Sequence, residues 1–294
     1  MTTAQPVDFF EHERRRLFSL AYGFLGSRAE AEDIVQEAWL RWHKDESQEK
    51  REPAAWLTTV TARLALDHLR SARVRRETYP GVWLPEPVVD APSAETSILV
   101  KSELSVAFLF VLERLGAEER AAFVLREVFD HSYREIGEVL GKSEAACRQL
   151  VKRGREKLRE ERFDPGAVDR GECERVMGSF VTALGTGDEE QLLRLLAPDA
   201  VLYGDGGGKA PSIVNPLYGA DRIVRFLVGV HKKYPGVFSS RPVQVNGAPA
   251  LLVVRDEAVQ GVSCYAVEGG RVSRIFHILN PEKINLPLSQ YTPV

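Results

Sequence analysis

Two helical patterns separated by a tight corner, between Tyr133 and Arg159, constrain the fold of this chain more than any other feature. Apolar residues recur at helical spacing in both halves, so each half is expected to bury one face of a helix. Between the halves, Gly141 suits the left-handed conformation that ends a helix, and Ser143 can accept hydrogen bonds from the first free amides of the next. The segment is therefore predicted to form a helix-turn-helix.

The second helix of this motif is expected to turn a polar and basic face outward, because its apolar residues point inward. Such side chains can reach base edges and phosphates in a major groove. We expect Arg148 and Gln149 to contact base edges, and Lys152, Arg153 and Arg155 to contact phosphates. The remaining candidates, at the start of the helix, are Ser143, Glu144 and Ala145. The alternative is a basic, solvated helix in a helical bundle.

The net charge of the 294-residue chain is only −3, so a nucleic-acid surface must be local. Two clusters of basic residues supply such a local surface. From Arg63 to Arg76 there are five arginines against one Asp67, and from Arg148 to Arg162 seven basic residues stand against three acidic ones. Local patches of this kind provide phosphate affinity without a basic overall charge.

The three cysteines, Cys147, Cys173 and Cys264, lie far apart without the spacing of a zinc site or a disulfide framework. We therefore expect no metal, no cofactor and a reducing cytoplasmic location. No apolar run approaches the roughly 18 residues that a membrane span needs, so no membrane partner is expected.

The N-terminal half is predicted to contain two helical domains joined by a linker. Helices account for residues 1–78, with a capping box formed by Ser27 and Glu30 and with Pro53 as the first residue of the third helix. Residues 79–99 hold too many prolines for a helix. Leaving Trp83 and Leu84 of its WLPEP segment exposed to water would cost free energy, so we expect part of this linker to dock against another part of the protein. An unattached linker is the alternative. Residues 100–163 resume the helical pattern.

The last part, residues 168–294, is predicted to be an α+β domain. Two helices, near residues 172–184 and 189–196, precede four apolar runs with turn signals between them. Those signals are Asn246-Gly247, Asp256-Glu257 and Gly269-Gly270. Asn-Gly and Gly-Gly between such runs favour hairpins, so residues 241–279 are predicted to form an antiparallel meander.

Three segments resemble extracytoplasmic-function (ECF) sigma factors, in order and in spacing. The core-polymerase-binding helix is matched by SRAEAEDIVQEAWLRWH, and the segment that opens and reads the minus-ten promoter element by REPAAWLTTVTARLALDHLRSARVRRE. The fourth sigma region, which reads the minus-thirty-five element, is matched by LGAEERAAFVLREVFDHSYREIGEVLGKSEAACRQLVKRGREKLR. The resemblance implies two all-α sigma domains, a core RNA polymerase partner with its beta and beta-prime subunits, promoter DNA, and no enzymatic reaction.

Three shorter motifs resemble the SigJ-type subgroup of these factors: WLPEP, DGGGK at 205–209 and NPEKI at 280–284. Members of this subgroup carry a C-terminal SnoaL-like domain, an α+β cone with a curved antiparallel sheet, which is taken to regulate the sigma factor in cis. Position 209 is lysine in this chain, where members of the subgroup commonly have arginine, and a lysine cannot make the bidentate pairing that an arginine could make there.

The resemblance also implies which residues act. For core-polymerase binding they are Asp33, Gln36, Glu37 and Leu40, although acidic residues there also favour the helix dipole. For the minus-ten element they are Trp56, Thr59, Arg63, Asp67 and Arg70, which fall on or near one helical face, and Arg73, which is expected to attract the DNA backbone. The alternative is a solvated helix with Glu or Asp partners elsewhere. For regulatory contacts they are Trp83, Leu84, Pro85, Asp205, Gly206, Gly207, Gly208, Lys209, Asn280, Pro281 and Lys283, or else a loop and a tail turn.

A different function remains possible at the level of sequence, because SnoaL-like domains include cyclases and isomerases. The titratable candidates for such a reaction are Tyr203, Asp205, His231 and His277. A ligand-sensing domain fused to a DNA-binding module, with a small-molecule effector in the cone, is the related alternative. The DGGGK run lacks the spacing of a phosphate-binding loop, so we do not expect it to bind a nucleotide.

Overall fold

The computed structural model describes residues 6–44, 52–89, 104–161 and 170–284, and the chain forms two compact units. The helical unit consists of Met1–Glu77, Ile98–Leu104 and Phe108–Phe163, and the sheet unit consists of Thr78–Ser97, Ser105–Ala107 and Asp164–Val294. The predicted linker residues 90–99 and the predicted boundary at Asp164-Pro165-Gly166 lie outside the described residues.

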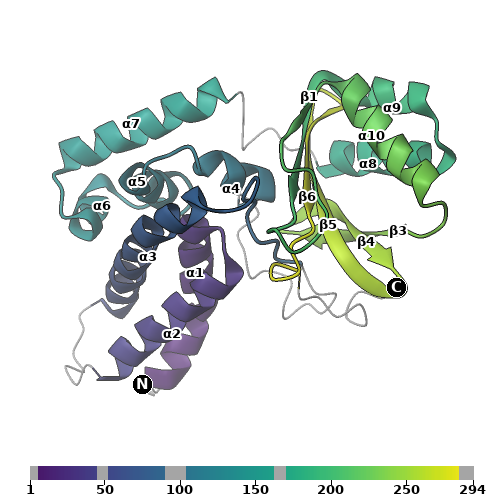
Figure 1. The fold of residues 1–294 in the computed structure, drawn as a ribbon. Coiled ribbons are helices and arrows are strands. Elements are labelled where there is room, and N and C mark those ends of the chain that lie inside the picture. Colours follow the sequence, from purple (N-terminus) through teal and green to yellow (C-terminus); the bar gives the residue numbers. More distant parts are fainter. Residues whose placement is uncertain (1–5, 45–51, 90–103, 162–169, 285–294) are drawn as a thin grey trace. The chain divides into compact units, whose positions relative to one another are not determined.

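Three long helices form the first half of the helical unit (Figure 1). They are α1 (Pro6–Leu25), α2 (Arg28–Lys44) and α3 (Pro53–Glu77). Helix α1 ends where Gly26 takes a left-handed φ of 64°, a conformation open to glycine because it has no Cβ. The hydroxyl of Ser27 then accepts a hydrogen bond from the Glu30 amide at 3.3 Å, as the capping box predicts.

The second half of the helical unit contains the helix-turn-helix. Its helices are α4 (Val106–Leu112), α5 (Ala117–Glu127), α6 (Tyr133–Leu140) and α7 (Glu144–Glu160). Gly141 ends α6 with a φ of 65°, and the Ser143 hydroxyl caps α7 by accepting from the Ala146 amide at 3.2 Å. Gly154 lets α7 approach α5, since a Cβ there would meet the Phe123 ring at 3.0 Å. The predicted helix-turn-helix is confirmed.

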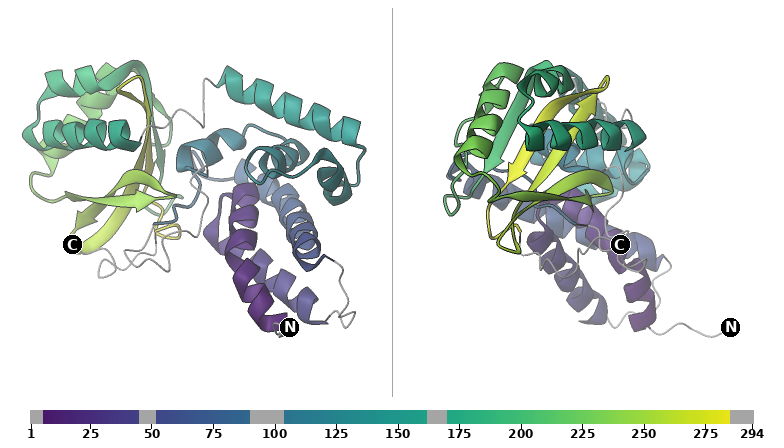
Figure 2. Two further views of the ribbon diagram at one scale, coloured as in Figure 1. Left: turned by 180° about the vertical axis from the view of Figure 1, so that it is seen from behind. Right: turned by 90° about the vertical axis from the view of Figure 1, so that its right-hand side faces the viewer.

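The sheet unit combines a six-stranded sheet, in the order β2-β1-β6-β5-β4-β3, with three helices. The helices α8 (Arg170–Thr186), α9 (Glu189–Leu195) and α10 (Ala220–Lys233) cover one face of the curved sheet (Figure 2). Its strands are β1 (Leu196–Asp205), β2 (Leu217–Tyr218), β3 (Ser239–Val245), β4 (Ala248–Arg255), β5 (Ala258–Glu268) and β6 (Arg271–Ile278).

The predicted antiparallel meander is formed by β3 to β6. Each of its three two-residue turns has positive φ at both positions, from 49° at Asp256 to 72° at Gly270, which is the geometry of tight hairpins. The sequence did not predict α10, or the parallel pairing of β1 with β6, so the sheet is mixed at that point. The predicted fold class, two helical domains followed by an α+β domain, is confirmed.

Alternation along β1 assigns its side chains to the two faces of the sheet. Leu202 packs in the core formed with the three helices. Because successive side chains of a strand point to opposite faces, Tyr203 and Asp205 lie on the face away from those helices. The ring of Tyr203 stacks on that of Phe276 there, with centroids 5.5 Å apart.

Candidate nucleic-acid and polymerase interfaces

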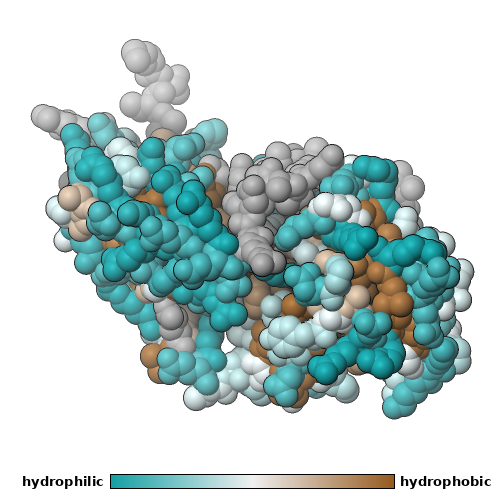
Figure 3. All heavy atoms as spheres, turned by 90° about the horizontal axis from the view of Figure 1, so that it is seen from above, coloured by the Kyte–Doolittle hydropathy of each residue, from teal (hydrophilic) through white to brown (hydrophobic). Residues whose placement is uncertain are grey.

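The outer face of α7 is formed by exposed polar and basic side chains, and the helical unit is mainly hydrophilic where α7 runs (Figure 3). Ala145 and Gln149 are exposed. The basic side chains pair with carboxylates: Arg148 with Glu144 at 2.8 Å, Lys152 with Glu156 at 3.8 Å, Arg153 with Glu119 at 3.7 Å and Arg155 with Glu127 at 2.7 Å. Exposed ion pairs of this kind contribute roughly 0–1 kcal/mol each, so they leave the basic groups available to DNA phosphates.

The candidate minus-ten residues on α3 contact other helices of the helical unit. The Trp56 ring is half-buried 5.7 Å from that of Trp42, and Thr59 is half-buried. Arg63 donates to the carbonyl of Glu138 at 2.6 Å and to that of Val139 at 3.3 Å. These carbonyls belong to the last turn of α6, where backbone acceptors lack helical partners.

The remaining candidate minus-ten residues are Asp67, Arg70 and Arg73. Arg70 pairs with Asp67 and with Glu118 of α5, both at 3.2 Å. The side chain of Arg73 lies outside the part of the chain that the structure describes. The structure therefore places Arg63 and Arg70 against helices of the helix-turn-helix domain, with both side chains exposed and with carboxylate partners for Arg70, as the solvated-helix alternative expects for that residue.

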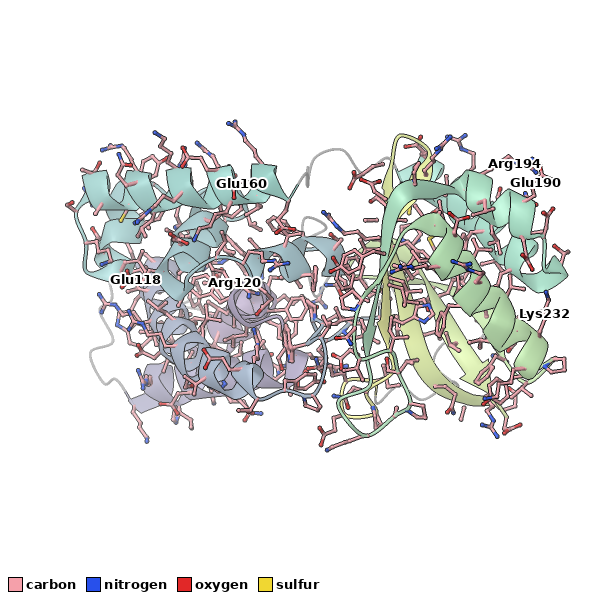
Figure 4. The ribbon with its side chains drawn as sticks, turned by 45° about the horizontal axis from the view of Figure 1, so that its top comes forward. Glu118, Arg120, Glu160, Glu190, Arg194 and Lys232 are labelled. Atoms are coloured by element: carbon pink, nitrogen blue, oxygen red, sulfur yellow. The ribbon has the colours of Figure 1, made fainter. Side chains whose placement is uncertain are left out.

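A buried ion cluster joins the same helices. Arg120 lies inside the helical unit and is 1% exposed (Figure 4), where it pairs with Glu113 and donates to the Gly23 carbonyl at 3.3 Å. Arg76 of α3 also pairs with Glu113, at 2.6 Å. Burial opposes the charge of Glu113, but the guanidiniums of Arg120 and Arg76 outweigh it and hold the pKa of this carboxyl below its usual value. The sequence analysis missed this cluster.

The candidate polymerase-binding residues lie on the outer side of α2. Asp33 and Gln36 are exposed, and Glu37 pairs with Arg41 at 2.9 Å. Leu40 is 49% exposed, as are several other large apolar side chains in the described residues.

Asp205, at the end of β1, is 1% exposed and holds the linker. Its carboxylate accepts hydrogen bonds from the Tyr79 hydroxyl at 2.6 Å and from the Leu84 amide at 2.9 Å. The Gly207 amide also donates to it, at 3.1 Å. Burial, and then the bond to Asp205, raise the pKa of the Tyr79 hydroxyl far above its ordinary value.

Lys283, from the segment after β6, completes this buried cluster. Its ammonium donates to Asp205 at 2.7 Å and to the Leu84 carbonyl at 2.5 Å. It also lies 4.2 Å from the centroid of the Trp83 ring and 5.0 Å from that of Tyr79, within the range of cation–π attraction. We call Tyr79, Trp83, Leu84, Asp205, Asn280 and Lys283 the latch.

The other regulatory candidates surround the latch. Leu84 and Pro85 are buried, and the Asn280 amide donates to the Tyr79 hydroxyl at 2.8 Å. Gly207 has a φ of 60°, and a Cβ there would meet the Asn280 side chain at 2.3 Å, so this position requires glycine. Gly206 is buried beneath the turn, and its carbonyl accepts from the Lys209 amide at 2.9 Å.

The outer edge of the latch is solvated. Gly208 and Pro281 are exposed, and Lys209 pairs with Glu282 at the surface. A second anchor for the linker, which the sequence analysis missed, is Asn246 in the β3–β4 turn. The side-chain oxygen of Asn246 accepts a hydrogen bond from the Val88 backbone amide at 2.9 Å, and the backbone amide of Asn246 donates to the Val88 carbonyl at 2.8 Å.

The four titratable candidates for an enzymatic reaction are not brought together. Tyr203 and Asp205 lie on the sheet face away from the helices, whereas His277 shares the helix-covered face with Ile275 by strand alternation. Burial lowers the pKa of His277 to about 4. His231 lies in the last turn of α10.

Two family models match the helical unit: Sigma-70 region 2 over residues 9–75 and Sigma-70, region 4 over residues 105–158. The fold and its basic faces thus define a sigma factor of the sigma-70 class. The chain is 41% identical over 290 residues to the ECF RNA polymerase sigma factor SigJ of Mycobacterium tuberculosis, covering 94% of this chain and 92% of that protein. It is 32% identical over 290 residues to the probable ECF sigma factor SigI of the same species, covering 97% of both.

The crystal structure of the Mycobacterium tuberculosis SigJ superimposes with a TM-score of 0.78 at 36% identity, covering 97% of this chain and 98% of that one. The chain belongs to the ECF RNA polymerase sigma factors, and the sigma-factor function expected from its sequence is confirmed. None of the helices in the described residues has the length and apolar character needed to cross a membrane.

Proposed function

We propose that this sigma factor uses α2 to bind core RNA polymerase, α3 to read the minus-ten element and α7 to read the minus-thirty-five element. Exposed Leu40 among Asp33 and Gln36 supports the first role. The arginine-rich end of α3 and the basic face of α7 support the other two. The residue-level test is a base-by-base promoter scan with Arg148→Ala and Lys152→Ala, because a base contact alters preference at one position and a phosphate contact weakens all promoters similarly.

The contacts of Arg63 and Arg70 support a closed form of the factor. Arg63 donates to two carbonyls of α6, and these bonds must break before its guanidinium can hold promoter phosphates, whereas the exposed pair of Arg70 with Glu118 is weak. We therefore expect α3 to separate from these helices when core polymerase and promoter bind. A distance between labels on α3 and α6 that stays constant on promoter binding would contradict this part of the proposal.

The C-terminal domain, in this proposal, controls the sigma factor in cis by holding the linker that joins its two DNA-reading domains. The single observation that carries this part is the buried contact of Asp205 and Lys283 with Leu84. Because Tyr79 and Leu84 follow α3 directly in the chain, holding or releasing them changes how freely the two DNA-reading domains can move apart.

Reconstituted transcription with core polymerase tests this control. The full chain is compared with truncations after Arg162 and before Asn280, and with Asp205→Asn. Lys209→Ala is the matched control, because it removes only the exposed pair with Glu282. Altered transcript yield with Asp205→Asn and unaltered yield with Lys209→Ala would support control through the latch. Equal yields from all forms would exclude cis control and leave the sigma function intact.

A further inference from the structure

The aromatic ring of Tyr133 lies beneath the arginine that we assign to base reading. Tyr133 is the first residue of α6 and is half-buried. The guanidinium carbon of Arg148, on α7, is 5.0 Å from the centroid of this ring. A guanidinium at this distance is attracted to the ring electrostatically and can stack on it.

A second guanidinium supports the ring. The guanidinium carbon of Arg126, in the last turn of α5, is 5.1 Å from the Tyr133 centroid, and Arg126 also donates to the His131 carbonyl at 3.0 Å. The ring thus contacts arginines from both flanking helices of the domain. Because Arg126 is held by a backbone carbonyl, the ring has a defined position against which Arg148 rests.

Glu144 restrains the same arginine from its own helix. Its carboxylate binds one terminal nitrogen of Arg148 at 2.8 Å, one turn away on α7. A guanidinium has five N–H donors in a planar fork, so its other donors stay available to a base. A long side chain held in advance loses less conformational freedom on binding than a free one, and a bidentate contact with guanine depends on the plane of the fork.

We propose that Tyr133 is a positioning residue for promoter reading: its ring, with Glu144, sets the plane of the Arg148 guanidinium that meets a base in the minus-thirty-five element. This inference deepens the proposed function and rests on the assignment of Arg148 to base reading. Tyr133 itself touches no base in this arrangement and acts through Arg148.

The test compares Tyr133→Leu, which removes the ring, with Tyr133→Phe, which keeps it. Each is made in the full chain, alone and together with Arg148→Ala, and assembled with core polymerase. Initiation is measured on promoter duplexes that carry each base at every position of the upstream element. Tyr234→Leu is the matched control, because that ring also carries a cationic contact, with Lys233 at 5.2 Å, but lies in the sheet unit.

Arg148→Ala is expected to reduce base preference at one position by at least roughly fivefold. Tyr133→Leu is expected to reduce preference at that same position by roughly two- to fivefold, the effect of an exposed cation–π contact. Tyr133→Phe and Tyr234→Leu should leave the preference unchanged, and Tyr133→Leu should have no further effect once Arg148 is alanine.

Two outcomes would overturn the inference in distinguishable ways. If Tyr133→Leu weakens initiation equally on all duplexes, or acts equally without Arg148, the ring supports the fold and does not position the arginine. If Arg148→Ala leaves every base preference intact, the base-reading assignment fails and the positioning role fails with it. Thermal unfolding of each variant separates loss of the domain from loss of preference.

Discussion

Asp205→Asn is expected to release the linker from the C-terminal domain. The Asp205 residue is 1% exposed, and its carboxylate binds both Tyr79 and Leu84 of the linker, while Lys283 balances its charge. Asparagine has the same shape, but it is neutral and retains one acceptor oxygen in place of two. The substitution therefore leaves the Lys283 ammonium without its counter-charge and removes at least one hydrogen bond to the linker.

The magnitude follows from the burial of the pair, since the Lys283 side chain is 9% exposed and that of Asp205 is 0% exposed. Removing one partner of a buried ion pair costs about 3–5 kcal/mol. With tenfold for each 1.4 kcal/mol, this cost sets an upper limit of roughly 140- to 3,700-fold on the shift of the linker's docking equilibrium towards release, because part of it falls on the domain that carries both charges.

Hydrogen exchange followed by mass spectrometry measures this shift on the full chain. Peptides covering residues 79–89 should lose protection in Asp205→Asn. Lys209→Ala should leave protection unchanged, because its exposed pair with Glu282 contributes about 0–1 kcal/mol. Lys283→Met provides a second way to break the pair. Full protection of the linker in both latch variants, with the domain folded, would refute the reasoning that the buried charges hold it.

Three further predictions concern other parts of the chain. His277 has a pKa of about 4 when folded, against an ordinary 6.5, so the unfolded chain gains its proton first as pH falls. We expect up to about 3 kcal/mol of unfolding free energy to be lost between pH 7 and pH 4 and this loss to be absent in His277→Asn, as measured by urea unfolding at each pH. Gly137→Ala should destabilise the helix-turn-helix by about 1–3 kcal/mol, because its Cβ would meet the Lys142 carbonyl at 2.6 Å, whereas Gly178→Ala, with open space, should be neutral or stabilising in thermal unfolding. Leu40→Ala should weaken binding to core polymerase about tenfold or more, as measured by titration, with stability changed by less than about 0.5 kcal/mol; unchanged affinity would remove Leu40 from the interface.

Local signals predicted the parts of the fold that neighbouring residues determine. Gly141 and Ser143 mark the corner of the helix-turn-helix because a left-handed glycine and a capping hydroxyl act within one turn of the chain. The hairpin turns follow in the same way from Asn246-Gly247 and Gly269-Gly270. Helix α10 also left a signal that was overlooked: Ile223, Val224, Leu227 and Val228 are buried at helical spacing.

Contacts between distant segments could not be predicted from the residues alone. The parallel pairing of β1 with β6 joins strands separated in the chain by β2, α10 and β3 to β5, and no pattern in either strand specifies its neighbour. The motifs that hold Leu84, Asp205 and Lys283 were recognised by resemblance, but their mutual contacts depend on the tertiary fold. Nothing in the sequence indicated that Tyr79 and Asn246 take part in holding the linker, since a tyrosine beside a proline and a turn asparagine are ordinary features.

The two anchors of the linker, the latch and Asn246, both bind its backbone amides and carbonyls. At one end Leu84 is held by its amide and carbonyl. Four residues later the backbone amide and carbonyl of Val88 are held by Asn246, next to the β-bridge between Val89 and Val245. Because main-chain groups make these bonds, the bonds themselves do not depend on which side chains stand at Leu84 and Val88, whereas the buried Pro85 and Pro87 between them restrict substitution. An inserted or deleted residue could not be accommodated, since both ends would no longer reach their partners. This stretch of linker is therefore a fixed-length spacer, whose number of residues is set by its two anchors.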